Sequence, residues 1–200
     1  MTQLFDRRPI LLAIAGPNGA GKSTFYRAHL EPAGLRFVNA DRIAKELQTD
    51  AYRAAAVADQ IRKRLTAKGE SFVFETVFSD PVGSKLQFLK EAERQGYTVV
   101  LFFIGIDSPA TSLERVAMRV AKGGHNVPTA KVASRYARVM QNLRRALSEL
   151  THVRVYDNSD LARPFRLVAL VEDGRLTLKL PTPGWLTPLL PANRPPCNLN

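Results

Sequence analysis

Residues 10–23 read ILLAIAGPNGAGKS, which joins a short apolar run to a glycine-rich loop. The loop matches the pattern G-x-x-x-x-G-K-[ST] in full, from Gly16 to Ser23. The apolar run before it is typical of a buried strand, and the pattern after it is typical of an amphipathic helix. Glycines let the backbone curl so that its N–H groups face phosphate oxygens, and the helix N-terminus adds positive dipole charge. We therefore predict a nucleoside triphosphate site rather than a glycine-rich turn without a ligand.

Two side chains of this loop have separate predicted roles. Lys22 reaches the β- and γ-phosphates of ATP or GTP, and the Ser23 hydroxyl binds Mg²⁺. The predicted nucleotide-binding residues are Gly16, Pro17, Asn18, Gly19, Ala20, Gly21, Lys22, Ser23 and Thr24.

Short apolar or β-branched runs alternate with helical patterns along the chain. Strands are expected over residues 10–15, 35–39, 71–74, 97–106 and 153–156. Helices are expected over residues 22–29, 42–47, 51–67, 81–94, 108–121 and 129–150. Strands that are apolar throughout indicate burial on both faces. The alternation predicts an α/β fold, a P-loop NTPase of nucleoside-kinase type with a parallel sheet flanked by helices.

Local residues support two of these helix starts. Asp80 and Ser108 each precede a proline, so each is a candidate N-cap with proline at the first helical position. Glu172-Asp173-Gly174 separates two apolar runs, which predicts a β-hairpin. Six prolines follow Leu180, which predicts an irregular C-terminal extension. The predicted organisation is one domain over residues 1–180, with a helical lid region at 111–150, and an extension at 181–200.

The composition limits the function classes. The chain has 200 residues, of which 45% are hydrophobic and 24% charged, as in a globular domain. Cys197 is the one cysteine, which excludes a disulfide scaffold and favours the cytoplasm. No run reaches the ~20 apolar residues of a membrane span. The apolar run after Arg7-Arg8 is also too short for a signal peptide.

The net charge of +11 points to anionic partners, and its location narrows them. Residues 111–145 hold eight Lys and Arg residues against one Glu. Between two basic helices lies Lys122-Gly123-Gly124-His125-Asn126-Val127-Pro128, where two glycines could act as a hinge. This stretch is a candidate lid that supplies cations to the transferred phosphate. The alternative is a solvated pair of basic helices, which we favour for Arg144 and Arg145.

Candidates for binding the phosphate acceptor follow two predicted strands. Asp41 follows residues 35–39 and is a candidate general base, although Asp is also a favoured N-cap and one residue could do both. Glu75 and Thr76 follow residues 71–74, where they could hold the acceptor or water on Mg²⁺, or cap the next loop. The carboxyl ends of parallel strands share one sheet edge, so these residues should lie beside the phosphate loop. Asp107 follows another apolar run, and a capping role with Ser108 is equally compatible.

Arg119 and Arg135 flank the candidate lid and are our predicted γ-phosphate ligands. Arg115 or Arg138, one turn away, could replace either of them. His125 is predicted to order the loop by a hydrogen bond, because the three histidines are not spaced as metal ligands.

These motifs together resemble the zeta-toxin family of small P-loop kinases, over roughly residues 10–158. Besides the phosphate loop, the resemblance rests on Asn39-Ala40-Asp41, Phe74-Glu75-Thr76, the segment Arg115–Pro128, Arg135-Tyr136 and Asn142-Leu143. The resemblance implies transfer of phosphate from ATP or GTP, with Mg²⁺, to the 3′-hydroxyl of the amino sugar of UDP-N-acetylglucosamine. It implies Asp41 as base, Lys22 and two lid arginines on the phosphates, Glu75 and Thr76 in the acceptor pocket, and a possible antitoxin partner.

Two other functions remain open from the sequence. The basic lid would also suit a nucleic-acid-binding ATPase or an end-processing kinase. Tyr136 is the one aromatic residue in 111–145, however, and stacking on nucleic acid usually needs several. A phosphotransferase acting on another small metabolite or an antibiotic is the second alternative.

Overall fold

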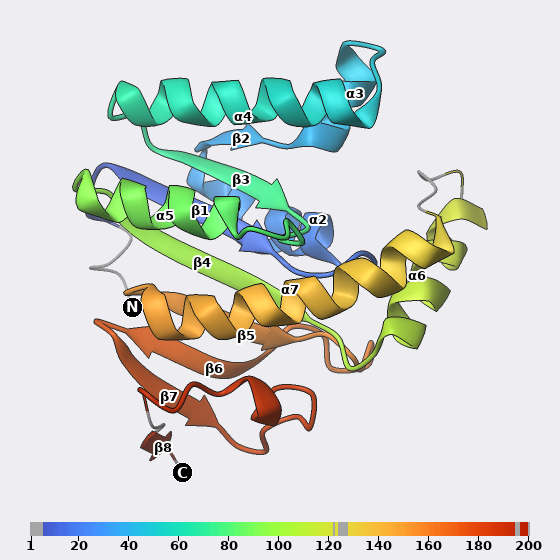
Figure 1. Cartoon of the computed structure of the whole chain (residues 1–200), viewed down its shortest axis with the longest axis vertical. Coiled ribbons are helices and arrows are strands. Elements are labelled where there is room, and N and C mark those ends of the chain that lie inside the picture. Colours follow the sequence, from blue (N-terminus) through green and yellow to red (C-terminus); the bar gives the residue numbers. More distant parts are fainter. Residues whose placement is uncertain (1–5, 122, 124–127, 195–196, 200) are drawn as a thin grey trace.

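A computed structural model of the chain describes residues 6–121, 123, 128–194 and 197–199. Within these residues the strands form one eight-stranded sheet in the order β2-β3-β1-β4-β5-β6-β7-β8. Strands β1 to β5 are mutually parallel, β6 is antiparallel to both of its neighbours, and β8 is parallel to β7. Helices cover both faces of the sheet (Figure 1). This is the predicted P-loop kinase fold.

Most elements lie within two residues of the predicted bounds. The strands are β1 (Ile10–Ala15), β2 (Arg36–Val38), β3 (Phe72–Thr76), β4 (Thr98–Gly105), β5 (Val153–Asp157), β6 (Arg166–Glu172), β7 (Arg175–Lys179) and β8 (Cys197–Leu199). The α-helices are α2 (Lys22–Phe25), α3 (Ala40–Glu46), α4 (Ala51–Ala67), α5 (Ser84–Arg94), α6 (Pro109–Ala121) and α7 (Thr129–Glu149). A π-helical turn (Tyr26–Leu30) continues α2, and 3₁₀ turns occur at Glu31–Ala33 and Thr187–Leu189.

The sheet is buried on both faces, as its apolar strands predicted. Every residue of β1 is buried, and alternate side chains enter two different cores. Leu11 packs in the core beneath α4, α5 and α7, whereas Leu12 packs in the core on the side of α2. Because residues of a strand alternate between faces, one apolar strand supplies both cores. Val116 and Val132 form a smaller cluster that joins α6 to α7 beyond the sheet.

The predicted start of one helix was wrong. Pro81 lies in a turn, and α5 begins at Ser84. The Asp80 carboxylate accepts a hydrogen bond from the Ser84 amide, and Gly83 between them has φ 74°. The Asp80 carboxylate therefore bonds to the first residue of a helix that starts three residues after the predicted start. Gly83, just before the helix, has a left-handed backbone conformation. At α6 the prediction was confirmed, because the Ser108 hydroxyl accepts from the Thr111 amide at 3.1 Å.

The C-terminal part folds onto the domain. The predicted hairpin is confirmed as β6–β7, whose turn residues Asp173 and Gly174 both have positive φ, as a type I′ turn requires. Residues 181–194 are irregular apart from the 3₁₀ turn at Thr187–Leu189, as predicted, but contacts with the domain were not predicted. Leu186 is fully buried in the main core, and residues 197–199 pair with β7. The apolar residues between the prolines give this segment its contact with the core.

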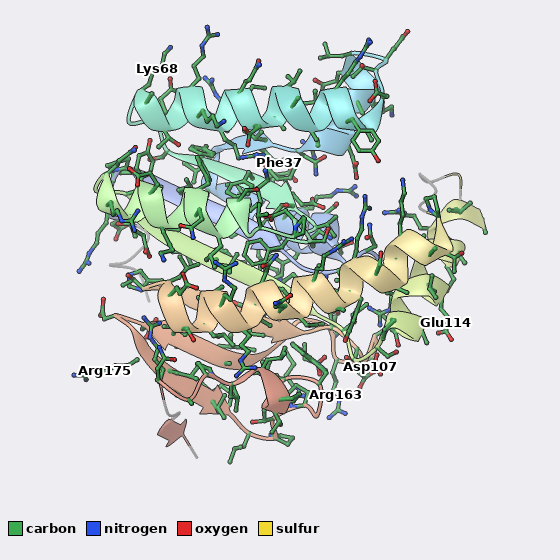
Figure 2. All side chains as sticks on the ribbon, viewed as in Figure 1. Phe37, Lys68, Asp107, Glu114, Arg163 and Arg175 are labelled. Atoms are coloured by element: carbon green, nitrogen blue, oxygen red, sulfur yellow. The ribbon has the colours of Figure 1, made fainter. Side chains whose placement is uncertain are left out.

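Many charged side chains of the helices and strands are exposed. Lys68 at the end of α4 and Arg175 at the start of β7 extend into solvent (Figure 2). Among the residues described here, no helix has both the length and the hydropathy to cross a membrane.

Arg62 of α4 is an exception, because only 4% of it is exposed. Its guanidinium lies 5.0 Å from the centre of the Phe74 ring and 2.7 Å from the Asp59 carboxylate. Lys63 and Lys85 also contact Asp59, at 2.9 and 3.4 Å. Partial burial raises the pKa of Asp59, but these cations outweigh it and lower the pKa to about 2. Asp59 is therefore the counter-ion of a buried arginine.

We expect Asp59→Asn to lower the free energy of unfolding by about 2 kcal/mol at neutral pH, because the buried guanidinium of Arg62 loses its counter-ion. The loss is moderate because the Asp59 carboxylate is partly exposed, so solvent already weakens the ion pair. The depressed pKa adds a pH signature. Its contribution to stability is present above the unfolded-state pKa of 3.8 and is lost as the pH falls toward 2. Urea unfolding from pH 7 to pH 2 measures both effects. Glu91→Gln, in the exposed pair with Arg94, is the control and should leave stability unchanged. Equal effects of the two variants would contradict this assignment.

Candidate active site at the phosphate loop

The loop between β1 and α2 is a tight turn that depends on its glycines. Gly19 and Gly21 have φ of 74° and 90°, in the left-handed region. A Cβ on Gly16 would overlap the main-chain carbonyl of Ile104 in β4. The loop therefore packs directly on the neighbouring strand, and the predicted nucleotide-binding residues form one continuous turn that leads into the N-terminus of α2.

Two buried side chains from distant elements hold this loop from outside. The Ser112 hydroxyl of α6 donates to the Asn18 carbonyl at 2.6 Å. The Asn158 amide, which follows β5, donates to the Ala20 carbonyl at 2.9 Å. Neither residue belongs to a sequence pattern that predicts this contact. The position of Asn158 after a predicted strand was the one indication of its role, because such strands end at the sheet edge where ligands bind.

Lys22 lies inside the loop and is only 7% exposed. Its amino group donates to the carbonyls of Gly16 (3.0 Å) and Pro17 (2.9 Å). Burial lowers the pKa of Lys22, the carboxylates of Glu75 and Asp41 raise it, and Arg119 lowers it further. Glu75, Asp41 and Arg119 therefore lie close enough to Lys22 to influence its charge.

Glu75 is the centre of a hydrogen-bonded group beside the loop. Its Oε2 atom accepts from the Ser23 hydroxyl at 3.0 Å and from the Asn39 amide at 2.9 Å. Strand β3 is longer than predicted, so Glu75 lies within it, opposite Ile14 of β1. The interpretation of Glu75 as a cap of the following loop is wrong, because its carboxylate faces Ser23.

Thr76 takes the role that had been considered for Glu75. Its hydroxyl accepts from the Phe78 amide at 3.2 Å, which closes the turn after β3. Phe78 is fully buried with φ 67°, a conformation that is costly for a bulky residue. Asn142 of α7 is 4% exposed and donates to the carbonyls of Phe78 (2.9 Å) and Asp80 (3.0 Å). A buried side chain of α7 thus fixes the loop beside the predicted acceptor pocket.

Asp41 is not the N-cap of α3. That position belongs to Asn39, whose side chain accepts from the Arg42 amide at 2.9 Å. Asp41 lies in the first helical turn and is exposed. The alternative of a capping aspartate is therefore wrong, and the Asp41 carboxylate can face a ligand.

Asp107 has a capping role, as the sequence allowed. It accepts from the Thr111 hydroxyl at 2.6 Å at the start of α6. Nearby, the Tyr136 hydroxyl donates to the Ile106 carbonyl at 2.8 Å. Burial and the Asp107 carboxylate raise the pKa of Tyr136 to about 12. Tyr136 therefore fastens α7 to the end of β4 as a neutral donor.

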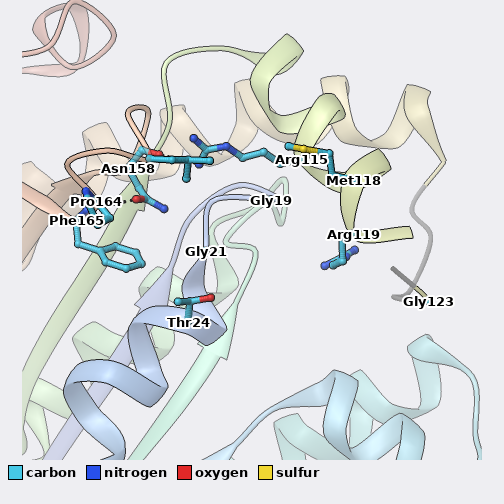
Figure 3. Close-up of a pocket in the computed structure, with 11 residues that line it drawn as sticks. Gly19, Gly21, Thr24, Arg115, Met118, Arg119, Gly123, Asn158, Pro164 and Phe165 are labelled. Carbon is cyan, nitrogen blue, oxygen red and sulfur yellow. Dashed lines mark hydrogen bonds between the residues drawn. The ribbon is translucent and has the colours of Figure 1, made fainter. Parts of the chain in front are cut away.

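A pocket of about 600 Å³ lies beside the phosphate loop, between α6 and the segment after β5 (Figure 3). It is lined by Gly19, Gly21, Thr24, Arg115, Met118, Arg119, Gly123, Asn158, Leu161, Pro164 and Phe165. Figure 3 shows Arg119 extending from α6 toward the side of the phosphate loop, and Phe165 on the opposite wall.

The four candidate arginines differ in their surroundings. Arg115 donates to the carbonyls of Asn158 (2.7 Å) and Ser159 (2.8 Å), so it joins α6 to the segment after β5. Arg119 lines the pocket and its charge reaches Lys22. Two others, Arg135 and Arg138, are half-buried on α7. Of the predicted catalytic set, the structure thus brings together Asp41, Lys22 and Arg119, and it does not bring Arg135 into the pocket lining.

The structure describes only part of the predicted lid. Its helices are α6 and α7, and Gly123 between them has φ 80°. Lys122, Gly124, His125, Asn126 and Val127 lie outside the described residues. The hinge and the hydrogen bond of His125 therefore stay predictions.

Sequence comparison relates the chain to a known family. Residues 11–145 match the AAA domain family. An uncharacterized protein of Haemophilus influenzae is 32% identical over 127 residues, which are 60% of this chain and 88% of that protein.

Solved structures share the fold. A chain of the AvrRxo1-ORF1:-ORF2 complex with ATP matches with a TM-score of 0.69 at 20% identity, over 88% of this chain and 63% of its own length. The present chain thus spans less than two thirds of that protein. A chain of the PezAT toxin–antitoxin system of Streptococcus pneumoniae matches with a TM-score of 0.57 at 17% identity, over 76% of this chain and 68% of its own.

We expect Asn142→Leu to lower the free energy of unfolding by about 1–3 kcal/mol, because two main-chain carbonyls lose their donor inside the protein. Urea unfolding measures the loss. Gln141→Leu changes an exposed neighbour on α7 and should have little effect. If both variants were as stable as the wild type, the Asn142 hydrogen bonds would not hold the loop after β3.

Proposed function

Because the chain belongs to the AAA domain family, we propose that it is a kinase that transfers the γ-phosphoryl group of ATP to a hydroxyl of a small sugar nucleotide. The observation that carries this proposal is the charge grouping at the sheet edge. A buried lysine of a phosphate loop lies within electrostatic reach of two carboxylates, Glu75 and Asp41. A phosphate loop with a carboxylate at its open side can bind a triphosphate and also deprotonate an acceptor.

In this proposal Gly16 to Thr24 bind the phosphates, and the adjacent pocket takes the ribose and base of ATP or GTP. The pocket suits a purine because Leu161, Pro164 and Phe165 give it an apolar wall. A protein of the same fold has been crystallised with ATP, which adds support.

The residues present also fit a magnesium ion. The Ser23 hydroxyl and Glu75 carboxylate lie 3.0 Å apart, and both are hard oxygen ligands of the kind Mg²⁺ prefers. In the described part of the chain, no three His, Cys, Asp or Glu side chains gather as ligands, so phosphate oxygens would complete the site. Ser23 would hold the ion and Glu75 would orient its water, and bound Mg²⁺ would neutralise phosphate charge.

The acceptor side is proposed from residues at three elements. Asp41, exposed on α3, would accept the proton of the attacking hydroxyl, while Glu75 and Thr76 would bind the acceptor. Arg119 would stabilise the charge of the transferred phosphoryl group, and its position in the pocket supports this role. Arg135 is proposed as its partner from its place beside the lid.

The specific acceptor that we propose is the 3′-hydroxyl of the amino sugar in UDP-N-acetylglucosamine. The motifs shared with zeta toxins support it, and the PezAT toxin–antitoxin chain has the same fold. The same likeness supports an antitoxin protein as partner, since the AvrRxo1 chains were also crystallised as a complex. We place this activity in the cytoplasm, in one domain over residues 1–180 that includes the lid at 111–150, with residues 181–200 as an extension.

Incubation with ATP, Mg²⁺ and UDP-N-acetylglucosamine tests the acceptor, with mass spectrometry as readout. We expect a product heavier by one phosphoryl group that depends on Lys22. Turnover of another metabolite or an antibiotic, with none of this sugar nucleotide, would replace the acceptor but keep the kinase.

We expect Asp41→Asn to lower kcat about 10²–10⁴-fold, the usual effect of losing a general base, and to leave ATP affinity nearly unchanged. Steady-state kinetics and calorimetric titration with ATP separate the two. The matched control is Glu46→Gln, an exposed carboxylate at the other end of α3, which should retain wild-type kcat. Near-normal transfer by Asp41→Asn would remove Asp41 from the mechanism.

A nucleic-acid end-processing kinase or ATPase is the second candidate, favoured by the basic residues of α6 and α7. It predicts tight binding of an oligonucleotide whose affinity falls steeply with salt. For the small-molecule kinase we expect weak oligonucleotide binding at 150 mM salt, measured by fluorescence anisotropy.

A further inference from the structure

We propose that Trp185, in the segment after β7, is a positioning residue for the nucleotide pocket. It acts through Asp157 and the segment 158–165 that forms one pocket wall. This inference rests on the proposed function, because it concerns how the same pocket holds ATP.

The Trp185 side chain is fixed at the end of two central strands. Its indole N–H donates to Asp157 Oδ1 at 3.1 Å, and Asp157 is the last residue of β5. Its ring lies over Gly105, which is paired with Asp157 across β4 and β5, and a Cβ at Gly105 would overlap the ring. Leu186, the next residue, is fully buried. The segment after β7 is thus anchored at the strand ends that lead to the pocket.

A second contact joins the same segment to the same carboxylate. Arg166 donates to the Pro181 carbonyl at 2.6 Å and to Asp157 Oδ2 at 3.2 Å. Burial raises the pKa of Asp157, but hydrogen bonds from Ser159, Trp185 and Arg166 outweigh it and lower the pKa. The carboxylate is therefore charged at neutral pH and receives hydrogen bonds on both oxygens.

From Asp157 the contacts continue into the pocket. Asp157 Oδ1 also accepts from the Ser159 amide at 3.1 Å, which shapes the first turn of the wall. The Asn158 side chain accepts from the Phe165 amide at 3.3 Å and donates to the Ala20 carbonyl of the phosphate loop at 2.9 Å. Asn158 and Phe165 both line the pocket.

The wall needs such support because one of its residues is strained. Phe165 has φ 55°, which a bulky residue rarely adopts unless its surroundings impose it. The AAA domain match ends at residue 145, so the wall and its support lie outside the matched residues. Because contacts beyond the phosphate loop also hold this wall, a substitution can weaken the wall while the phosphate loop keeps its conformation.

The test is calorimetric titration of the full chain with Mg²⁺–ATP. Trp185→Phe keeps an aromatic ring over Gly105 but removes the N–H donor. We expect the Kd for ATP to rise about 3–10-fold, because the binding free energy loses a part of what one hydrogen bond to a charged group contributes. The kcat at saturating ATP should change less than about two-fold. Gly105→Ala displaces the ring without touching the nucleotide and should raise the Kd similarly.

Leu189→Ala is the matched control. Leu189 packs on the same core from the same segment, so its truncation should lower the Tm and leave the Kd unchanged. The inference is overturned if Trp185→Phe and Gly105→Ala bind ATP as tightly as the wild type. It is also overturned if Leu189→Ala raises the Kd equally, because the effect would then follow stability. A wild-type chain that does not bind ATP refutes the proposed function itself, and the inference with it.

Discussion

The site depends on keeping a buried ammonium charged beside a loop made of carbonyls and amides. Lys22 must be a cation to bind phosphate, yet its burial in the loop favours the neutral amine. The Gly16 and Pro17 carbonyls accept hydrogen bonds from its ammonium group, and Glu75 and Asp41 supply the opposing charge. The carboxylates at this edge of the sheet, Glu75 first, therefore favour the charged form of Lys22 before any substrate arrives.

The parallel sheet is what brings those carboxylates to Lys22. Strands β1 and β3 are neighbours and end at the same edge, so Glu75 lies opposite Ile14 and faces the first turn of α2. Asn39, at the end of β2, bonds to Glu75 with its amide and caps α3 with its carbonyl oxygen. One asparagine thus fixes the carboxylate beside the phosphate loop and the helix that carries Asp41. A change at this residue would disturb both sides of the site.

Patterns local in sequence predicted most of the fold, and contacts distant in sequence decided the rest. The apolar run of β1 and the helical pattern of α4 gave their observed bounds because burial on both faces and periodicity are properties of neighbouring residues. The prediction of Asp41 as a candidate cap was wrong because α3 begins at Ala40, two residues before its predicted start, which makes Asn39 the cap. Ser112 and Asn158 reach the phosphate loop across 94 and 138 residues, and no spacing rule identifies such pairs.

Two basic residues of α6, Arg115 and Arg119, have different physical roles. Arg115 donates hydrogen bonds to two main-chain carbonyls of the pocket wall, so it stabilises the fold of the wall. Arg119, one turn further along α6, lines the pocket and lowers the pKa of Lys22 by charge repulsion, which an anionic ligand would relieve. Cationic side chains that a fold already holds in place lower the cost of binding an anionic ligand. The local charge of the site, rather than the net charge of the chain, therefore carries the proposal of a phosphate-bearing substrate.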